Sequence, residues 1–146
     1  MQFTWARIFY QFGPYENERR LVPSIICNLM DGNHISLTSG SHFRDYLFIE
    51  DVASALAAIG NTNLCGEVNI GSGMPVKIRE IACLIGNLLG REELLGFGEI
   101  QMTENEPMRI VSNNRLLKET ACWTPKYSLN QGLLRTVDWF KEMRRQ

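Results

Sequence analysis

The sequence has no excess of charge of either sign. It contains 15 basic and 16 acidic side chains, for a formal net charge of -1. A protein that binds nucleic acid normally carries a basic stripe of Lys and Arg, so we expect no nucleic-acid partner. Intrinsic disorder is excluded as well, because 45% of the residues are hydrophobic and 10% are aromatic.

Long hydrophobic runs are also missing. Apolar stretches such as residues 52–59 and 81–89 are far shorter than the roughly 20 residues that a membrane-spanning helix needs. The first residues lack the charged start and the apolar run of a secretory signal. We therefore expect a soluble, cytoplasmic protein with no membrane partner.

Cysteine and histidine are few and scattered. The four cysteines form no Cys-x-x-Cys pair, and the two histidines, His34 and His42, lie close to none of them in the sequence. Neither a disulfide framework nor a metal-ligand set has this spacing. We expect reduced cysteines in the core of a cytosolic protein, and no metal site.

The glycine patterns that hold phosphates at the start of a helix are absent. The Gly-x-Gly pairs at residues 71–73 and 96–98 have no third glycine at the required position, and neither Gly-x-x-x-x-Gly-Lys nor Gly-x-Ser-x-Gly occurs. The closely spaced Asp45, Glu50 and Asp51 indicate a turn and a helix cap rather than a catalytic carboxylate pair. No catalytic residue is predicted.

What the chain does contain is an alternation of short strands and helices. Its 146 residues are enough for one domain, or for part of one. Apolar and β-branched residues predict strands at 3–10, 34–38, 67–70 and 94–100, the first of them buried. Helical spacing of apolar residues predicts helices at about 23–30, 52–59, 78–89, 113–122 and 129–145. The predicted fold class is α/β.

Two residues are expected to delimit the predicted helix at 52–59. The Asp51 carboxylate can accept the free amide hydrogens of the first turn, and Gly60 can adopt the left-handed conformation at the end. Gly90 is expected to end the helix at 78–89.

Six segments, taken in order, resemble one family: the extended short-chain dehydrogenase/reductases that modify nucleotide sugars, or NAD(P)-dependent epimerases/dehydratases. Residues 7–14 resemble the family's Arg-x-Phe-Asn-x-Tyr-Gly-Pro strand and turn, and residues 32–46 resemble its Gly-x-Gly-x-Gln-x-Arg-Asp-Phe segment. The other matching segments are 21–24, 48–55, 67–73 and 116–140. The match covers nearly the whole chain.

The resemblance is to the C-terminal part of such an enzyme only. The family's cofactor-binding half carries a Gly-x-x-Gly-x-x-Gly turn and a Tyr-x-x-x-Lys catalytic pair, and no tyrosine here has a lysine four residues later. The resemblance implies a single C-terminal, substrate-binding portion over residues 1–146, without the N-terminal cofactor-binding half. Its fold would combine partial Rossmann-like sheet strands with the family's small α/β substrate-binding subdomain.

Arg44 is the strongest site residue that the resemblance implies. The family uses the arginine of Arg-Asp-Phe/Tyr on the nucleotide diphosphate, and a guanidinium can make the forked, charge-assisted contact that this group requires. The alternative is a structural ion pair with Asp45 or Glu50. Tyr10 takes the place of a substrate-contacting asparagine, although a phenol cannot reproduce the paired donor and acceptor of an amide.

The remaining substrate-binding candidates each have a structural alternative. Val22 and Pro23 match the place where the family's chain passes the base, but helix-start packing explains them equally well. His42 is either a donor to a phosphate or sugar or a surface-loop histidine. Arg20 and Arg109 are either secondary phosphate contacts or solvated surface residues; the family's Arg-Pro-Gly-Asp motif is missing from residues 104–109, where many members have it.

The cofactor implied by the resemblance is NAD or NADP in the complete enzyme, with none expected on this chain alone. Ile8 and Phe9 would line the nicotinamide end of that enzyme, but here they are more safely assigned to the core. The expected ligand of the chain is a nucleoside diphosphate sugar.

Three functions stay open. The first is a catalytically incompetent, nucleotide-sugar-binding portion of an epimerase, dehydratase or reductase, made as a truncated gene product or an excised piece. The second is a stand-alone nucleotide-sugar-binding or partner-docking module that assembles with a separate cofactor-binding chain. The third is an independently active enzyme. Because the family's central sheet would lack its other strands, we expect exposed sheet edges that self-associate or recruit a partner chain.

Overall fold

The structure is a computed structural model that describes residues 3–145. Its strands are β1 (Thr4–Ile8), β2 (Tyr10–Phe12), β3 (Ile35–Leu37), β4 (Phe43–Arg44), β5 (Tyr46–Phe48), β6 (Gly66–Ile70), β7 (Val76–Lys77), β8 (Leu95–Phe97) and β9 (Arg109–Ile110). Its helices are α1 (Leu21–Met30), α2 (Ile49–Gly60), α3 (Ile78–Leu89), α4 (Arg115–Ala121) and α5 (Leu129–Met143), with a 3-10 turn at Glu92–Leu94. The predicted α/β class is confirmed.

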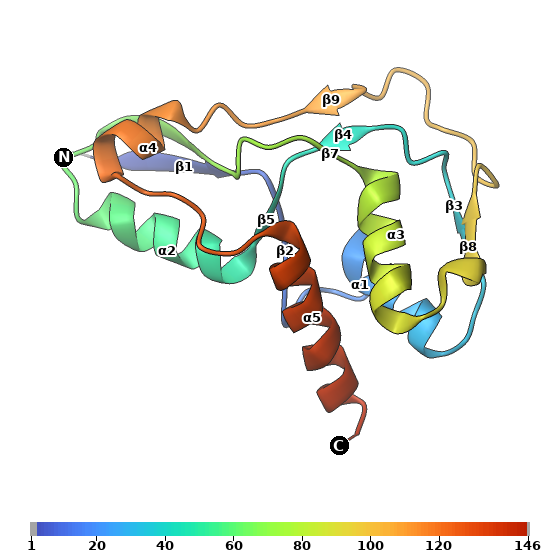
Figure 1. Cartoon of the computed structure of the whole chain (residues 1–146). Coiled ribbons are helices and arrows are strands. Elements are labelled where there is room, and N and C mark those ends of the chain that lie inside the picture. The colour runs from blue at the N-terminus through green and yellow to red at the C-terminus, as the bar shows by residue number, and fades with distance from the viewer. Residues whose placement is uncertain (1–2, 146) are drawn as a thin grey trace.

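The strands form four small sheets rather than one. β1 pairs with β6, β2 with β5 and β3 with β8, all in parallel, while β4 is parallel to β9 and antiparallel to β7. Parallel neighbours need a crossover between them, so each pair joins segments that lie far apart in the sequence. Figure 1 shows β2 and β5 in the middle, with β1, α2 and α4 to one side and α1, α3, β3 and β8 to the other.

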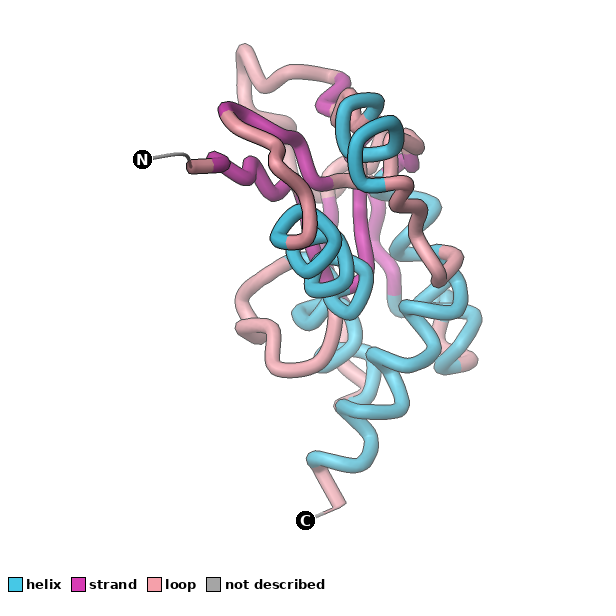
Figure 2. Tube along the Cα trace, turned by 90° about the vertical axis from the view of Figure 1, so that its left-hand side faces the viewer, coloured by secondary structure: helices cyan, strands magenta, loops and turns pink. Residues whose placement is uncertain are grey.

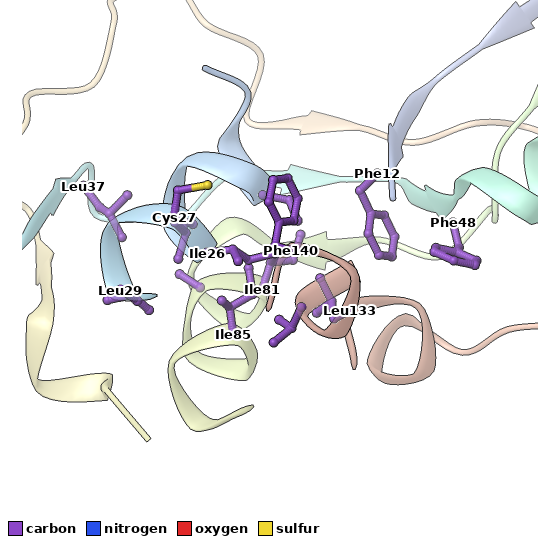
Figure 3. Packing of buried hydrophobic residues seen from close by; sticks show 14 residues of the cluster. Phe12, Ile26, Cys27, Leu29, Leu37, Phe48, Ile81, Ile85, Leu133 and Phe140 are labelled. Carbon is purple, nitrogen blue, oxygen red and sulfur yellow. The ribbon is translucent and has the colours of Figure 1, made fainter. Parts of the chain in front are cut away.

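Two hydrophobic clusters fill these two sides and meet at β5. The first cluster joins α1, α3 and α5 through residues such as Ile26, Ile81 and Leu133, and it reaches Phe12 and Phe48 (Figure 3). The second cluster, built from Leu47 of β5, α2, β6 and α4, lies on the other side. Neighbouring residues of a strand point to opposite faces, so Leu47 and Phe48 serve different clusters. The small sheet β2–β5 therefore lies between the two clusters and contributes side chains to both.

The helices follow the predicted periodicity closely. α3 has the predicted bounds and ends at Gly90, whose φ of 64° is left-handed. α5 begins with a capping box, in which the Ser128 hydroxyl accepts from the Gln131 amide and the Gln131 side chain accepts from the Ser128 amide. Its C-terminal end projects away from the strands (Figure 2). Among residues 3–145, no helix combines the length and the apolar character needed to cross a membrane.

The predicted strand at residues 3–10 is wrong in two respects. The chain leaves the β1–β6 ladder after Ile8 and starts a new pairing at Tyr10, so one predicted strand is two. It is not buried either, since Phe3 and Trp5 are both 63% exposed. Apolar residues are buried only where other segments pack over them. Among residues 3–145, no segment packs over the side of β1 that carries Trp5.

The predicted limits of the second helix are also wrong. α2 begins at Ile49, so Asp51 lies inside its first turn, and the buried Asp51 carboxylate instead accepts from the amides of Lys126 (2.8 Å) and Tyr127 (3.1 Å). The two Asp51 oxygens, which would have accepted amide hydrogens of the helix as a cap, thus accept those of a distant segment. Gly60 does not adopt the left-handed conformation, because it is the last residue of the helix itself.

The cysteines are free, but only Cys27 lies in the core. Cys83 is partly buried, and Cys65 and Cys122 are exposed, so the expectation of core cysteines is wrong for these two. Cys122 has a φ of 50° at the end of α4, a conformation that costs a side chain about 1–2 kcal/mol. Among residues 3–145 no three His, Cys, Asp or Glu side chains gather as a metal site would require.

The buried carboxylate of Asp45 joins three parts of the fold. Its Oδ1 accepts from the amide (2.8 Å) and hydroxyl (2.5 Å) of Ser72, and its Oδ2 accepts from the amides of Gly73 and Ser112 (3.0 Å each) and from the Ser112 hydroxyl (2.5 Å). Asp45 is 0% exposed. These five donors compensate for the loss of water around the carboxylate. Gly71 leaves the space that Asp45 occupies, because a Cβ at Gly71 would lie only 2.7 Å from the Asp45 Oδ2.

We predict that Asp45→Asn lowers the free energy of unfolding by about 3 kcal/mol. An amide nitrogen would face backbone N–H donors in place of one oxygen, and buried donors would lose their acceptor. Urea denaturation measures the change. Asp138→Asn, at an exposed position of α5, is the control and should be neutral. A loss below about 1 kcal/mol would show that Asp45 does not hold these segments together.

Candidate functional site

Arg44 lies almost completely buried in β4, with 2% of its surface exposed. Its Nη1 donates to the main-chain oxygens of Phe43 and Pro107, each at 2.9 Å, and its Nη2 donates to the Glu106 carboxylate. The ion pair predicted as an alternative role therefore exists, but its partner is Glu106 and not Asp45 or Glu50. Asp45 is occupied on the other side of the chain by Ser72, Gly73 and Ser112.

The Arg44 guanidinium keeps hydrogen-bonding capacity. A guanidinium has five N–H donors, and three of those on Arg44 are used by Phe43, Pro107 and Glu106. The Nε–H and the second Nη2–H have no hydrogen-bond acceptor among residues 3–145.

Tyr10 and Tyr46 form an aromatic wall beside Arg44. Their ring centroids are 5.5 Å apart, and the guanidinium carbon of Arg44 lies 5.8 Å from the centre of the Tyr10 ring. A cation at this distance is attracted by the face of the ring. The structure thus places Tyr10 next to Arg44, as expected of two residues in one site.

A cavity of about 480 Å³ lies beside Glu106, the ion-pair partner of Arg44, and Arg44 itself is not among its lining residues. It is lined by Glu106 and His42, by the start of α1 and by the segment around β3. His42 is only 3% exposed, so its interpretation as a surface-loop histidine is wrong. No side chain among residues 3–145 hydrogen-bonds to its ring, and the imidazole therefore lies at the cavity with its polar atoms unused.

A second cavity, of about 290 Å³, lies beside Tyr10 and Ile110, two neighbours of Arg44, and Arg44 does not line it either. Its lining consists of Ile8, Phe9, Tyr10, Arg20 and Ile110. The assignment of Ile8 to the core is wrong, because this side chain is 45% exposed, and Phe9 is only partly buried. Arg20 brings a cation to this cavity.

The other predicted residues lie outside both cavities. Val22 and Pro23 are buried in α1, and the cavity beside them is lined by Leu21, Ser24 and Ile25 instead, which favours the helix-packing explanation. Arg109 is exposed on β9, where its guanidinium carbon lies 5.9 Å from the ring of Phe43.

Glu16 is a residue of this region that the sequence did not single out. Only 13% of its side chain is exposed, and its Oε2 is buried without a hydrogen-bond partner. Burial raises the pKa of the Glu16 carboxyl, although Arg20, at 3.4 Å from Oε1, partly opposes the shift. Burial, with the charge of Glu16, also raises the pKa of Tyr46. Because its pKa is raised, the Glu16 carboxyl holds its proton to higher pH in the folded chain than in the unfolded chain.

The sequence carried little signal for Glu16 or Glu106. Both occur in loops with several polar neighbours, where a charged residue normally faces water. Their contacts with Arg20 and Arg44 depend on loops whose course local patterning does not predict. Only the i,i+4 spacing of Glu16 and Arg20 could have indicated the first pair.

We predict that Glu16→Gln stabilises the chain above neutral pH and has no such effect in acid. A raised folded-state pKa means that stability is lost as pH rises from about 4.5 through the folded pKa. A neutral amide avoids that loss. Thermal or urea unfolding from about pH 4 to pH 8 measures it. Glu18→Gln, two residues away and exposed, is the control. A pH profile identical in wild type and Glu16→Gln would contradict the assignment.

Comparison with known sequences identifies relatives of the chain. The sequence model described as the NAD dependent epimerase/dehydratase family matches residues 1–71. UDP-glucuronic acid decarboxylase 1 of Xenopus tropicalis is 30% identical over 140 residues, which are 94% of this chain and 33% of that protein. CDP-abequose synthase of Salmonella typhimurium is 27% identical over 91% of this chain and 46% of its own length. The chain thus spans between a third and a half of these two relatives.

Solved structures agree. dTDP-glucose 4,6-dehydratase from Bacillus anthracis, determined in complex with NAD, superposes with a TM-score of 0.88 at 26% identity, over 97% of this chain and 45% of that one. UDP-glucose 4-epimerase from Thermotoga maritima, determined with UDP-glucose, has a TM-score of 0.91 at 21% identity, over 99% and 47% of the two chains, and supports the fold. The resemblance drawn from the sequence is confirmed: the chain is a part-length relative of the NAD-dependent epimerase/dehydratase family.

Proposed function

We propose that this chain is the nucleotide-sugar-binding portion of a nucleotide-sugar epimerase, dehydratase or reductase, and that Arg44 takes the diphosphate. The single observation that carries the proposal is the buried guanidinium of Arg44, which has two N–H donors without an acceptor among residues 3–145 and whose contact partners Glu106 and Tyr10 each line a cavity. A buried cation with free donors is an anion site, because an oxygen anion can satisfy the donors that water reaches poorly.

The two cavities suit the two ends of such a ligand. The larger one, of about 480 Å³, combines apolar walls with His42, and it has room for a base and ribose. The smaller one, of about 290 Å³, presents the phenol of Tyr10 and the guanidinium of Arg20, which can hydrogen-bond to a sugar or to the second phosphate. Glu106 and Tyr10, which line one cavity each, both contact Arg44, so a diphosphate at Arg44 would connect the two halves. Arg109 is too exposed to be more than a peripheral contact.

The residues of this chain could form only one edge of a binding site for NAD or NADP. Ile8 and Phe9 offer an apolar wall at the smaller cavity, where a nicotinamide ring could pack in a complete enzyme. The 146 residues contain no glycine-rich turn to hold a dinucleotide pyrophosphate. When bound, NAD or NADP would supply hydride transfer; this chain's residues would bind and orient the sugar nucleotide and exclude water.

On its own the chain is proposed to bind without catalysing. Hydride transfer at a sugar hydroxyl needs a positioned acid/base, and no tyrosine here is followed by the lysine that the family pairs with it. Burial raises the pKa of Tyr46 and so keeps its phenol protonated, which makes the phenolate that a general base needs less available than in an ordinary tyrosine.

Titration with UDP tests the anion site. We predict saturable shifts of backbone amides in β4 and residues 38–42 in nitrogen-proton NMR spectra, and binding at least about 10-fold weaker in Arg44→Lys, because a single ammonium cannot replace the fork. Arg115→Lys, exposed on α4, is the control. Circular dichroism establishes that each variant is folded. Equal binding by wild type and Arg44→Lys, or no binding by wild type, would contradict the proposal.

A second candidate function, a module that assembles with a separate cofactor-binding chain, is favoured by the sheet β1–β6. Within residues 3–145 each of these strands pairs only with the other, so each leaves one edge unpaired. Trp5 of β1 and Phe3, just before the strand, expose large apolar surfaces. Such an edge and face are typical of a surface that another polypeptide covers.

In the absence of that partner, we predict self-association through β1. Light scattering should report a mass that rises with protein concentration, and Trp5→Ser should reduce the rise because it removes the largest exposed apolar side chain of the strand. Met74→Ser, equally exposed but away from this sheet, is the matched control. A constant monomer mass in the wild-type chain would count against an interaction surface here.

A further inference from the structure

Glu106 is the one carboxylate that touches Arg44 among residues 3–145. It belongs to residues 98–108, which form neither helix nor strand between β8 and β9. It also lines the larger cavity, in which the proposed function places part of the ligand. A carboxylate and a phosphate are both oxygen anions, and they compete for the same guanidinium donors.

Resting on the proposed function, we propose that Glu106 is an internal competitor for the anion site: its carboxylate occupies Arg44 in the free chain and must leave when a diphosphate binds. Like charges at contact distance repel, and the repulsion is strongest where water is excluded, as around this buried arginine. A diphosphate beside a retained Glu106 carboxylate would therefore be unfavourable.

The two partners differ in their freedom to move. Arg44 is 2% exposed and donates to the main-chain oxygens of Phe43 and Pro107, two contacts that do not involve the Glu106 side chain. The Glu106 side chain is 41% exposed. Its amide makes a long bond of 3.4 Å to Thr103, after Asn105 at a φ of 66°. The carboxylate can rotate into water while the guanidinium stays in place, so the site is preformed and its occupant is removable.

The opposite role for Glu106 predicts the opposite sign. If its carboxylate accepted hydroxyl groups of the ligand from within the cavity, neutralising it would weaken binding. If it competes for Arg44, neutralising it strengthens binding. Inorganic pyrophosphate isolates the competition, because it carries the anion and offers no ribose or sugar hydroxyl.

The experiment compares Glu106→Gln with Glu104→Gln, a control two residues earlier in the same exposed segment. We expect Glu106→Gln to bind pyrophosphate and UDP about 10-fold more tightly than wild type in calorimetry or NMR titration, and Glu104→Gln to bind like wild type. Unchanged or weaker binding by Glu106→Gln, while wild type binds, would overturn the inference and leave the proposed function standing.

A ligand-free measurement separates the two hypotheses further. Nitrogen-proton NMR spectra of the Arg44 guanidinium should change in Glu106→Gln and not in Glu104→Gln, because only the first substitution alters its acceptor. If the Arg44 signals change as expected but neither wild type nor Glu106→Gln binds pyrophosphate or UDP, the proposed function is wrong and this inference with it. Unchanged Arg44 signals would contradict the Glu106 contact itself.

Discussion

The arrangement of the candidate site depends on the burial of the Asp45 carboxylate. A carboxylate removed from water is stable only where donors replace its hydration, and Asp45 obtains five from Ser72, Gly73 and Ser112. These donors come from segments 27 to 67 residues further along the chain. Neighbouring residues of an extended chain point in opposite directions. Fixing Asp45 on one side therefore directs Arg44 to the other, toward Glu106 and Tyr10.

The same alternation organises the cores. Within β5, Tyr46 and Phe48 pack on the first cluster and Leu47 on the second. The segment from Arg44 to Phe48 thus supplies, residue by residue, the guanidinium of the site, the carboxylate that anchors it, and side chains for both hydrophobic clusters. A change of register by one residue in this segment would exchange all of these roles, because it would reverse every side chain. The site is specified as strongly as the core is.

Local features of the sequence predicted the helices well and the contacts between distant segments poorly. The apolar spacing of residues 78–89 and the glycine after them are local signals, and α3 has the predicted bounds. Asp51 shows the opposite case. The local sequence predicted a helix cap, but the Asp51 carboxylate accepts hydrogen bonds from the distant amides of Lys126 and Tyr127 instead. Glu106 and Arg44 are 62 residues apart, and no local pattern connects them. Arg44 itself was found through the family's motif, but its burial and its partner were not.

The Glu106 contact also compensates for the burial of the Arg44 guanidinium. Removing a cation from water is costly unless a counter-charge or several acceptors compensate, and two main-chain oxygens compensate only in part. The Glu106 carboxylate supplies the remaining charge, which stabilises the free chain. Under the proposed function, the same carboxylate would oppose an incoming anion at Arg44. Stability of the chain and affinity for a diphosphate would then be coupled with opposite sign at Glu106, so that a change that strengthens the ion pair would weaken anion binding.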